Sequence, residues 1–410
     1  MSGRLLFISG RDPLDVDGGM EVYVRAHARA AVNIGFAPEI VCIGHTACTR
    51  ESDFGVVRRI ATPFRPHRQN MIAGHGPLLA RELVSVARKG KDPVLVHAFG
   101  VWGYAAVKGC TRLRREGSAS VPVLSSFTTF VDESISNARS KEGDPLRDVI
   151  SYRLQDLWAR AVVNRYERVA YRGAERVFYN YDSVRRLIHA AHGSQVRLAR
   201  LPYSPESEFL ESPSAPPAPA TVATLAPETA PLIVSMSTHH PRKGVDVLIA
   251  ALALARDRGT RLRAVLLGRG PLLAEHRRRV SEQGLAESVI VPGHVPEVHP
   301  YLAAADIFVL PSRREQSGSL ALLEALREGV PAIAAAVDGI REDVVDGESA
   351  LLVAPENPSA LAEALIRLTQ DASLRERLAA GGRHTFQERF TGERLTVALG
   401  DAYAELGFEP

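Results

Sequence analysis

The chain has 410 residues, which is too long for one ordinary hydrophobic core and predicts two domains of about 200 residues each. Its formal net charge of +3 divides unevenly, because residues 1–205 carry 30 basic and 19 acidic side chains and the remainder carries 20 and 28. The three cysteines (Cys42, Cys48 and Cys110) contain no C-x-x-C pair, which excludes a disulfide framework and a zinc site and fits a reducing cytoplasm.

The sequence offers no segment for membrane insertion. The apolar stretch near Met1 is too short for a signal peptide, and no run approaches the ~18 apolar residues that span a bilayer. We therefore expect a cytoplasmic protein whose membrane contact, if any, is peripheral at the inner face. The basic first half suggests an acidic substrate or an anionic membrane surface, and an arginine-rich composition spread over solvated faces is the alternative.

The first predicted unit is a strand, a glycine loop and a helix. Arg4–Ser9 is the strand, and Gly18-Gly19 stands where a helix to about Ile34 begins. Free amides at such a junction suit an oxyanion. The Asp15-Val-Asp17 triplet in this loop is expected to be solvated, and we expect no metal site.

Further strands are predicted at 39–43, 93–97 and 121–126, with an Arg- and Pro-rich stretch at 56–70 and a helix at 78–88. Residues 148–173 form a helical pattern in which arginines interleave with apolar side chains. We favour an ordinary surface helix whose apolar stripe faces the core over a helix that lies on an anionic membrane.

Composition then marks the domain boundaries. Strands at 176–179 and 196–201 complete a first domain over residues 1–205, and residues 206–230, rich in Pro and Ala, are predicted to be an extended linker. Residues 231–390 form the second domain. A last helix in residues 391–410 is expected to pack back on the first.

The second domain begins with the strand 231–236, after which Lys243-Gly244 opens a helix. The alternative to a functional role is a surface lysine in the first turn of a helix, a position that the dipole slightly disfavours. The strand at 266–267 runs into a glycine turn that contains Gly268 and Gly270.

The most informative stretch is Ser312–Pro331. Ile307–Leu310 reads as a buried strand, residues 317–319 as a turn and Leu320–Glu328 as a helix that ends at Gly329. The amides of Gly318, Ser319 and Leu320 have no partners within that helix, so a diphosphate is a natural occupant.

Two carboxylates bracket this turn. Glu315 precedes it, and Glu324 lies in the helix among leucines. Glu324 either pairs with Arg327 as a solvated side chain or accepts hydrogen bonds from sugar or ribose hydroxyls, and the pattern alone leaves both open.

The segment from Pro311 to Leu365, with its two glutamates and the sequence DGIRE at 338–342, resembles the donor-binding segment of retaining glycosyltransferases of family 4. The resemblance implies an α/β protein with the GT-B fold, in which two Rossmann-like domains face one another across a cleft. Three departures stand out. Eight residues instead of seven separate the glutamates, and Thr128 and Thr238 replace a usual histidine and arginine. His97, His239, His240 and Arg242 are candidate substitutes.

The resemblance implies transfer of a sugar from a nucleotide-diphosphate donor, a UDP-sugar first and a GDP-sugar second, to an acceptor hydroxyl with retention of configuration. No cofactor or metal is implied, nor a nucleic-acid partner, and the acceptor is expected to be acidic or lipid-linked. Lys243 and the Gly18-Gly19 loop are expected to stabilise the departing phosphate, and Glu315 with the amides near Gly318 to hold the sugar. Glu324 and the turn Gly268–Gly270 are expected to fix the nucleotide.

Two rival functions fit the same pattern. A sugar-nucleotide 2-epimerase shares the architecture and needs no acceptor, and a non-catalytic nucleotide-sugar-binding protein is suggested by Thr128 and Thr238. A dinucleotide oxidoreductase is disfavoured, because the 268–270 turn lacks the third glycine of that fingerprint.

Overall fold

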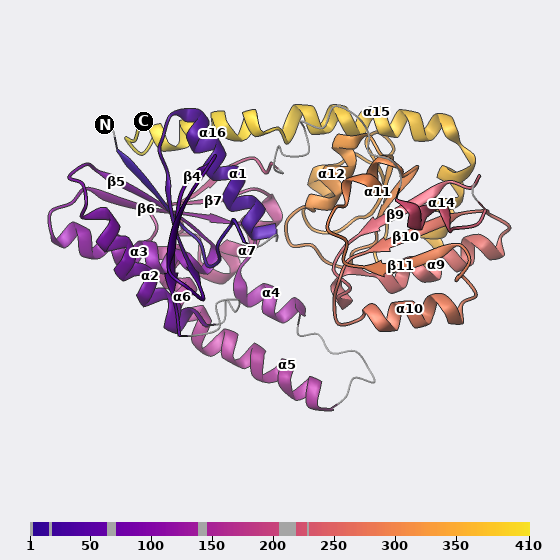
Figure 1. Cartoon of the computed structure of the whole chain (residues 1–410), viewed down its shortest axis with the longest axis horizontal. Helices are drawn as coiled ribbons and strands as arrows, with labels where there is room; N and C mark the ends of the chain where they lie inside the picture. The colour runs from indigo at the N-terminus through magenta and orange to yellow at the C-terminus, as the bar shows by residue number, and fades with distance from the viewer. Residues whose placement is uncertain (1–2, 16–18, 64–70, 138–145, 205–218, 228) are drawn as a thin grey trace. The chain divides into compact units, whose positions relative to one another are not determined.

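The computed structural model describes residues 3–15, 19–63, 71–137, 146–204, 219–227 and 229–410. The chain forms two compact units, unit 1 with Met1–Ser207 and Thr391–Pro410 and unit 2 with Glu208–Phe390 (Figure 1). Each unit has its own sheet flanked by helices, which confirms the predicted α/β class with a parallel sheet in each half.

The sheet of unit 1 has eight strands in the order β3-β4-β2-β1-β5-β6-β7-β8. Neighbours pair in parallel except for the antiparallel pair β3 and β4. The strands are β1 (Arg4–Ile8), β2 (Glu39–Gly44), β3 (Cys48–Ser52), β4 (Gly55–Ala61), β5 (Val94–Phe99), β6 (Ser120–Ser126), β7 (Arg176–Tyr179) and β8 (Leu198–Arg200). The central strands are buried along their length, as in parallel sheets covered on both faces.

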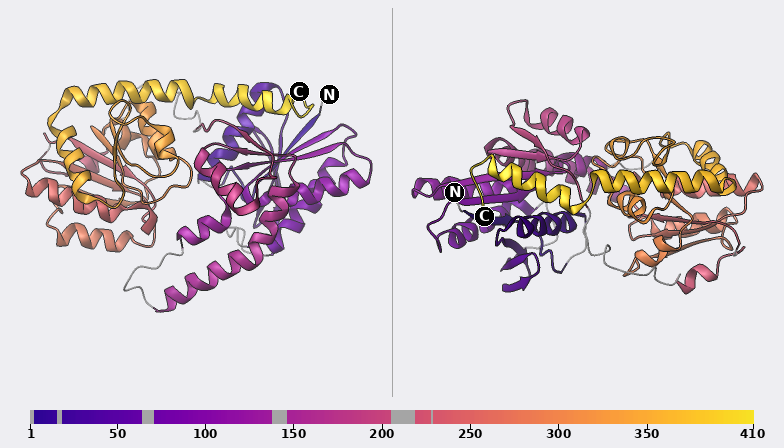
Figure 2. Two further views of the ribbon diagram at one scale, coloured as in Figure 1. Left: turned by 180° about the vertical axis from the view of Figure 1, so that it is seen from behind. Right: turned by 90° about the horizontal axis from the view of Figure 1, so that it is seen from above.

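The helices of unit 1 come from both ends of the chain. They are α1 (Gly19–Ile34), α2 (Ile72–Ala87), α3 (Gly103–Arg115), α4 (Phe130–Asn137), α5 (Leu146–Trp158), α6 (Asn164–Gly173), α7 (Asp182–His192) and α16 (Gly392–Ala404), with a 3₁₀ turn η2 (Gly100–Trp102) and a π turn η3 (Ala159–Val163). Helix α16 packs on α1. The amide of Gly3 donates to the carbonyl of Glu409 at 3.3 Å, so the two ends of the chain lie together (Figure 2).

Two features of unit 1 differ from the sequence-based expectation. The Arg-rich stretch from residue 56 contains β4, which pairs with β2 on one side and with the outer strand β3 on the other, and within it Val57 is buried. In the helical pattern at 148–173, Val163 is buried, but Leu154, Leu157 and Trp158 are exposed. The favoured interpretation, that the whole apolar stripe faces the core, is therefore wrong for α5.

Unit 2 has a parallel six-stranded sheet in the order β11-β10-β9-β12-β13-β14. Its strands are β9 (Leu232–Met236), β10 (Arg263–Leu267), β11 (Val289–Gly293), β12 (Ile307–Leu310), β13 (Ala332–Ala335) and β14 (Leu351–Val353). Its helices are α8 (Ala220–Ala223), α9 (Val245–Asp257), α10 (Leu273–Glu282), α11 (His299–Ala303), α12 (Leu320–Glu328), α13 (Ile340–Asp343), α14 (Pro358–Gln370) and α15 (Ala372–Arg389), with a 3₁₀ turn η5 (Pro241–Lys243).

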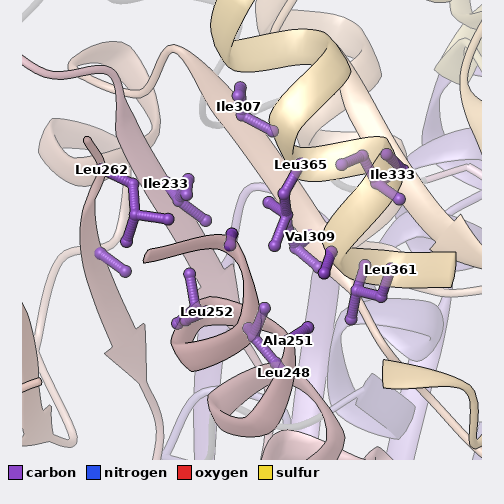
Figure 3. Packing of buried hydrophobic residues seen from close by; sticks show 14 of the residues in the cluster. Ile233, Leu248, Ala251, Leu252, Leu262, Ile307, Val309, Ile333, Leu361 and Leu365 are labelled. Carbon is purple, nitrogen blue, oxygen red and sulfur yellow. The ribbon is translucent and has the colours of Figure 1, made fainter. Parts of the chain in front are cut away.

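The core of unit 2 forms where α9 and α14 cover the central strands (Figure 3). Leu248 and Leu252 of α9 and Leu361 and Leu365 of α14 point toward Ile233, Ile307, Val309 and Ile333 of the sheet. Burial of these apolar surfaces stabilises unit 2. It also holds the parallel strands together, so that their carboxyl ends lie at one edge of the sheet.

The described part of the predicted linker is folded onto unit 2. Residues 205–218 and 228 lie outside the described residues, but Ala220–Ala223 forms α8, and Val222 and Leu225 are buried. The amide of Ala226 donates to the carbonyl of Glu287 at 3.0 Å. The expectation of an extended linker to residue 230 is therefore wrong for residues 219–227, because two apolar side chains there are enough to anchor a short turn.

Candidate functional site

Lys243 and Glu315 form an ion pair beyond the carboxyl ends of β9 and β12, which are neighbours in the unit 2 sheet. The Nζ atom of Lys243 lies 2.5 Å from Oε1 and 2.7 Å from Oε2 of Glu315. The turn that carries the lysine is fixed by its backbone, since the carbonyl of Arg242 accepts from the amide of Arg313 at 2.8 Å. A Cβ on Gly244 would lie 2.1 Å from the carbonyl oxygen of Pro311, so only glycine permits this approach.

Glu315 is buried, with 5% of its side chain exposed, and Lys243 is mostly covered, with 12% of its side chain exposed. Burial opposes the ionisation of Glu315, but the charges of Lys243 and Arg242 outweigh it and lower the pKa of this carboxyl. Burial lowers the pKa of Lys243, and the charge of Glu315 counteracts part of that effect. The result is a carboxylate held between two cations, because Nη1 of Arg242 lies 3.5 Å from Oε2.

The turn after Glu315 is held by Asp338. One carboxylate oxygen of Asp338 accepts from the amides of Glu315 and Gln316, each at 2.8 Å. Gln316 adopts a positive φ of 68°, which is uncommon for a residue with a side chain. In this turn the Glu315 side chain is directed at Lys243.

Three amides follow the turn at the start of α12. Among the described residues, none accepts a hydrogen bond from the amide of Gly318, Ser319 or Leu320. Ser319 stands at the N-cap with φ −119°, and its side chain does not cap the helix. Unpaired amides at the positive end of a helix, in the segment that also carries the partner of Lys243, form an anion-binding arrangement.

Glu324 lies one turn further along α12. Burial raises the pKa of this carboxyl to about 7, although Arg327 counteracts the shift. Arg327 instead pairs with Glu328, its Nη2 atom lying 2.9 Å from Oε1. The alternative of an exposed Glu324–Arg327 pair is therefore wrong, and no described residue donates a hydrogen bond to the Glu324 carboxylate.

Gly268 and Gly270 face the segment that follows β9 and not open space. Gly268 has a φ of 130°, and a Cβ there would lie 1.8 Å from the carbonyl oxygen of Ser237. A Cβ on Gly270 would lie 2.5 Å from the carbonyl oxygen of His239. Close packing between two backbone segments is thus a sufficient reason for both glycines.

The candidate substitutes for the arginine that Thr238 replaces differ in their surroundings in the structure. His239 is buried, and its Nδ1 lies 2.7 Å from Nδ1 of His276. Burial also lowers the pKa of His240, which disfavours its cationic form. Arg242, which reaches Glu315, is the cation that joins the site. Sequence spacing did not single it out, although its position beside Lys243 in a tight turn was available as a signal.

The predicted residues of unit 1 lie in a separate part of the chain. Gly18 is outside the described residues, and Gly19 is the exposed first residue of α1. The preceding loop is tied to β3 through Arg50, whose Nη atoms lie 2.5 Å from Asp12 and 2.7 Å from Asp15. Asp15 of the acidic triplet is therefore engaged by arginine, and Asp17 is outside the described residues.

Thr128 and His97 both belong to the interior of unit 1. Thr128 is buried just after β6. The Nδ1 atom of His97 lies 2.6 Å from the Tyr403 hydroxyl, and its Nε2 atom lies 2.7 Å from Oγ of Ser125. His97 is thus a core histidine with both nitrogens satisfied, and it does not replace the histidine missing at position 128.

Comparison with known families gives two matches along the chain. Residues 18–204 match the glycosyl transferase 4-like domain, and residues 230–371 match the glycosyl transferases group 1. The second match includes Lys243, Glu315, Asp338 and the start of α12.

Two curated relatives are similar to parts of the chain. A lipopolysaccharide core biosynthesis glycosyltransferase of Rhizobium meliloti, LpsE, is 33% identical over 183 residues, which are 44% of this chain and 50% of the relative. A GDP-mannose-dependent α-(1-6)-phosphatidylinositol monomannoside mannosyltransferase of Mycolicibacterium smegmatis is 33% identical over 181 residues, 41% of this chain and 47% of the relative. The chain thus spans about half the length of the curated relatives it matches.

Solved structures share the fold over nearly the whole chain. Sucrose-phosphate synthase from Thermosynechococcus elongatus has a TM-score of 0.76 at 22% identity, covering 99% of both chains. Anabaena Alr3699/HepE in complex with UDP and glucose has a TM-score of 0.70 at 16% identity, covering 98% of this chain and 99% of that one. The family matches and the sequence relatives show that the chain belongs to glycosyltransferase family 4, and these structures show that it has the GT-B fold.

Proposed function

We propose that the chain transfers a sugar from a nucleotide-diphosphate donor to an acceptor hydroxyl with retention of configuration. A UDP-sugar is the first choice of donor and a GDP-sugar the second. The observations that carry the proposal are the Lys243 ammonium, held by Glu315, and the amides of Gly318, Ser319 and Leu320, which have no partner among the described residues. Relatives and neighbours point to the same donor class, since one relative is named GDP-mannose-dependent and Alr3699/HepE was crystallised with UDP-glucose.

In the proposed reaction, the bond between the anomeric carbon and the β-phosphate oxygen breaks as the acceptor oxygen bonds that carbon on the same face. The acceptor proton passes to the departing phosphate, so nucleoside diphosphate and glycoside are the products. Negative charge grows on the leaving phosphate, where Lys243 and the amides of Gly318, Ser319 and Leu320 stabilise it.

The remaining residues orient the donor. Lys243 pairs with Glu315, so the phosphates of the donor replace this carboxylate as partner of the ammonium. Glu315 then accepts hydrogen bonds from the sugar hydroxyls. Glu324, which has no partner among the described residues, accepts from the nucleotide ribose, beside the Gly268–Gly270 turn. Neither a metal nor a cofactor takes part, and the acceptor is an acidic or lipid-linked alcohol.

Thermal unfolding in the presence of UDP-, GDP- and ADP-sugars tests the donor. A true donor at about one hundred times its Kd raises the free energy of unfolding by about 2.7 kcal/mol. The Lys243→Ala variant is expected to lose this stabilisation by the donor. Its turnover rate is expected to fall about 100-fold. The control is Lys91→Ala, which removes an exposed lysine in unit 1. Unfolding without ligand is measured in parallel, because the lysine's loss leaves the buried Glu315 carboxylate with Arg242 and the Ser312 hydroxyl as its partners.

Other outcomes would overturn the proposal in distinct ways. Conversion of a sugar nucleotide without any acceptor would identify a 2-epimerase. Tight donor binding without turnover across a panel of acceptors would identify a binding protein. Donor binding that is equal in Lys243→Ala and Lys91→Ala would refute the phosphate role of Lys243.

A further inference from the structure

Helix α5 exposes a stripe of large apolar side chains. Ile150 is 50% exposed, Leu154 61%, Leu157 63% and Trp158 43%. Their spacing of four, seven and eight residues from Ile150 places them on one side of an α-helix. Among the described residues they account for half of the large apolar side chains that are so exposed, and they lie within nine positions of one another.

This stripe is not the side by which the helix joins unit 1. Helix α5 continues through the π turn into α6, where Ala159, Val163 and Ala170 are buried. At about 100° per residue, Ala159 lies opposite Ile150 on the helix surface. Helix α5 extends from α6 away from the unit 1 sheet (Figure 1), and its neighbours in the fold are α4 and the π turn.

The surroundings of the stripe are basic. Residues 146–173 contain six arginines and three acidic residues. Of the acidic residues, Glu167 is buried, where it accepts a hydrogen bond from the amide of Phe130 at the start of α4. Arg153, Arg165 and Arg168 are exposed. Cations therefore border the apolar side chains, within a half of the chain that is itself basic.

We infer that the outer face of α5, formed by Ile150, Leu154, Leu157 and Trp158, docks on a membrane surface that contains anionic lipids. The helix lies in the interface with its apolar side chains among the acyl chains and its arginines at the lipid phosphates. Tryptophan is suited to this boundary because its ring is apolar and its N–H is polar. No helix among the described residues is long and apolar enough to cross a bilayer.

The size of the stripe favours a membrane over a protein partner. A stable protein interface buries about 800 Å² and 20–30 residues on each side. Four side chains over about two turns of a projecting helix fall well short of that, whereas interfacial helices bind through such a stripe together with charge attraction. The inference uses no step of the proposed reaction, so binding is measured without donor or acceptor.

The two tryptophans of the chain provide an intrinsic probe, because Trp102 is 1% exposed and Trp158 is 43% exposed. The full chain is mixed with vesicles of phosphatidylcholine alone or of phosphatidylcholine with phosphatidylglycerol. We expect co-sedimentation with the anionic vesicles and a shift of tryptophan emission to shorter wavelength. Trp158→Phe removes this emission shift while the buried Trp102 stays unchanged.

The variant Leu154→Ser/Leu157→Ser is expected to bind anionic vesicles at least about tenfold more weakly. Its matched control is Val345→Ser/Val397→Ser, which alters two valines that are 51% and 59% exposed on other elements and is expected to bind as the wild type does. Arg153→Gln/Arg165→Gln is expected to weaken binding at low salt more than at high salt. Circular dichroism checks that each variant is folded.

Three results would overturn the inference. The first is that the wild-type chain does not bind anionic vesicles. The second is that the leucine variant binds them as tightly as its valine control does. In the third, lipid-free sedimentation shows a dimer that the leucine variant dissociates while vesicle binding is absent, which would assign the face to a second copy of the chain.

Discussion

Glu315 and Glu324, which have eight residues between them, illustrate how the surroundings of a side chain set its chemistry. Glu315 is almost fully buried but lies between Lys243 and Arg242, which lower its pKa. Glu324 has no such partner, and burial raises its pKa to about 7. The first carboxylate is therefore held ionised by its neighbours, whereas the second changes charge near neutral pH.

The pH dependence of Glu324→Gln tests this difference. The unfolded chain releases the Glu324 proton near pH 4.5 and the folded chain near pH 7, so the free energy of unfolding falls as pH rises between these values. Glutamine carries no such proton. At pH 8 we expect the free energy of unfolding of Glu324→Gln to exceed that of the wild type by about 1 kcal/mol. Below pH 4.5 this difference should disappear. Urea denaturation at both pH values measures it.

Ligand binding should move in the opposite direction. If the ionised carboxylate accepts from ribose, UDP affinity of the wild type rises as pH increases through about 7 and that of Glu324→Gln is weaker and flat. The control, Glu363→Gln, alters a glutamate whose side chain is 66% exposed. A Glu324→Gln variant that retained the wild-type pH profile would exclude this carboxyl as the titrating group.

Among the strands and helices, the sequence predicted those that are defined by a local hydrophobic pattern and by a residue that ends the element. The strand Ile307–Leu310 and the helix Leu320–Glu328 match β12 and α12, and the helix ends at Gly329 with a φ of 70°. Glycine is the residue that adopts this left-handed conformation without strain. A continuous apolar run and a glycine stop are properties of the chain itself, so no tertiary contact was needed to find them.

Elements whose character depends on tertiary contacts escaped sequence analysis. The apolar residues of α5 have the same spacing whether they face a core or solvent, so periodicity did not reveal that Leu154 is exposed. Within the site, Lys243 and Glu315 were named from the pattern, but their mutual pairing was not. The contribution of Asp338 also depends on contact between two loops.

That loop contact leads to a prediction for Gly339. Its φ of −67° suits any residue, but a Cβ there would lie 2.5 Å from the amide nitrogen of Gly318. Both are backbone positions in packed loops, so the clash displaces the start of α12. We expect Gly339→Ala to lower the free energy of unfolding by about 1–3 kcal/mol and to weaken donor binding.

The matched control is Gly392→Ala, because a Cβ at Gly392 would meet no atom within 4 Å. Urea denaturation and donor titration are carried out on both variants. Equal stability and equal donor affinity in the two would contradict the close approach of the Gly339 and Gly318 loops.

At the scale of the whole molecule, the chain returns to unit 1 after completing unit 2. Thr391–Pro410 belongs to the unit formed by the first 207 residues, and α16 packs on α1. Tyr403 of α16 is fully buried, where its hydroxyl bonds His97 of β5, which in turn bonds Ser125 of β6. A polar chain of three residues therefore fastens the last helix to two neighbouring strands near the beginning of the sequence.

Tyr403→Phe should loosen unit 1 without affecting unit 2. The substitution keeps the ring but leaves Nδ1 of His97 buried without a partner, which costs about 1–3 kcal/mol. Burial lowers the pKa of His97 well below its usual value, which keeps the imidazole neutral. Hydrogen exchange of the full chain is expected to speed up in α16, β5 and β6 and to stay unchanged in the unit 2 sheet.

The control for this variant is Tyr104→Phe, which removes a hydroxyl that bonds no described residue, from a ring that packs edge-on against Tyr166. Exchange in β5 and β6 should then match the wild type. If hydrogen exchange in Tyr403→Phe became faster in both units, the two units would unfold together. The last helix would then couple the unfolding of one unit to that of the other. Faster exchange confined to unit 1 would mean that α16 stabilises unit 1 as an integral part of that unit alone.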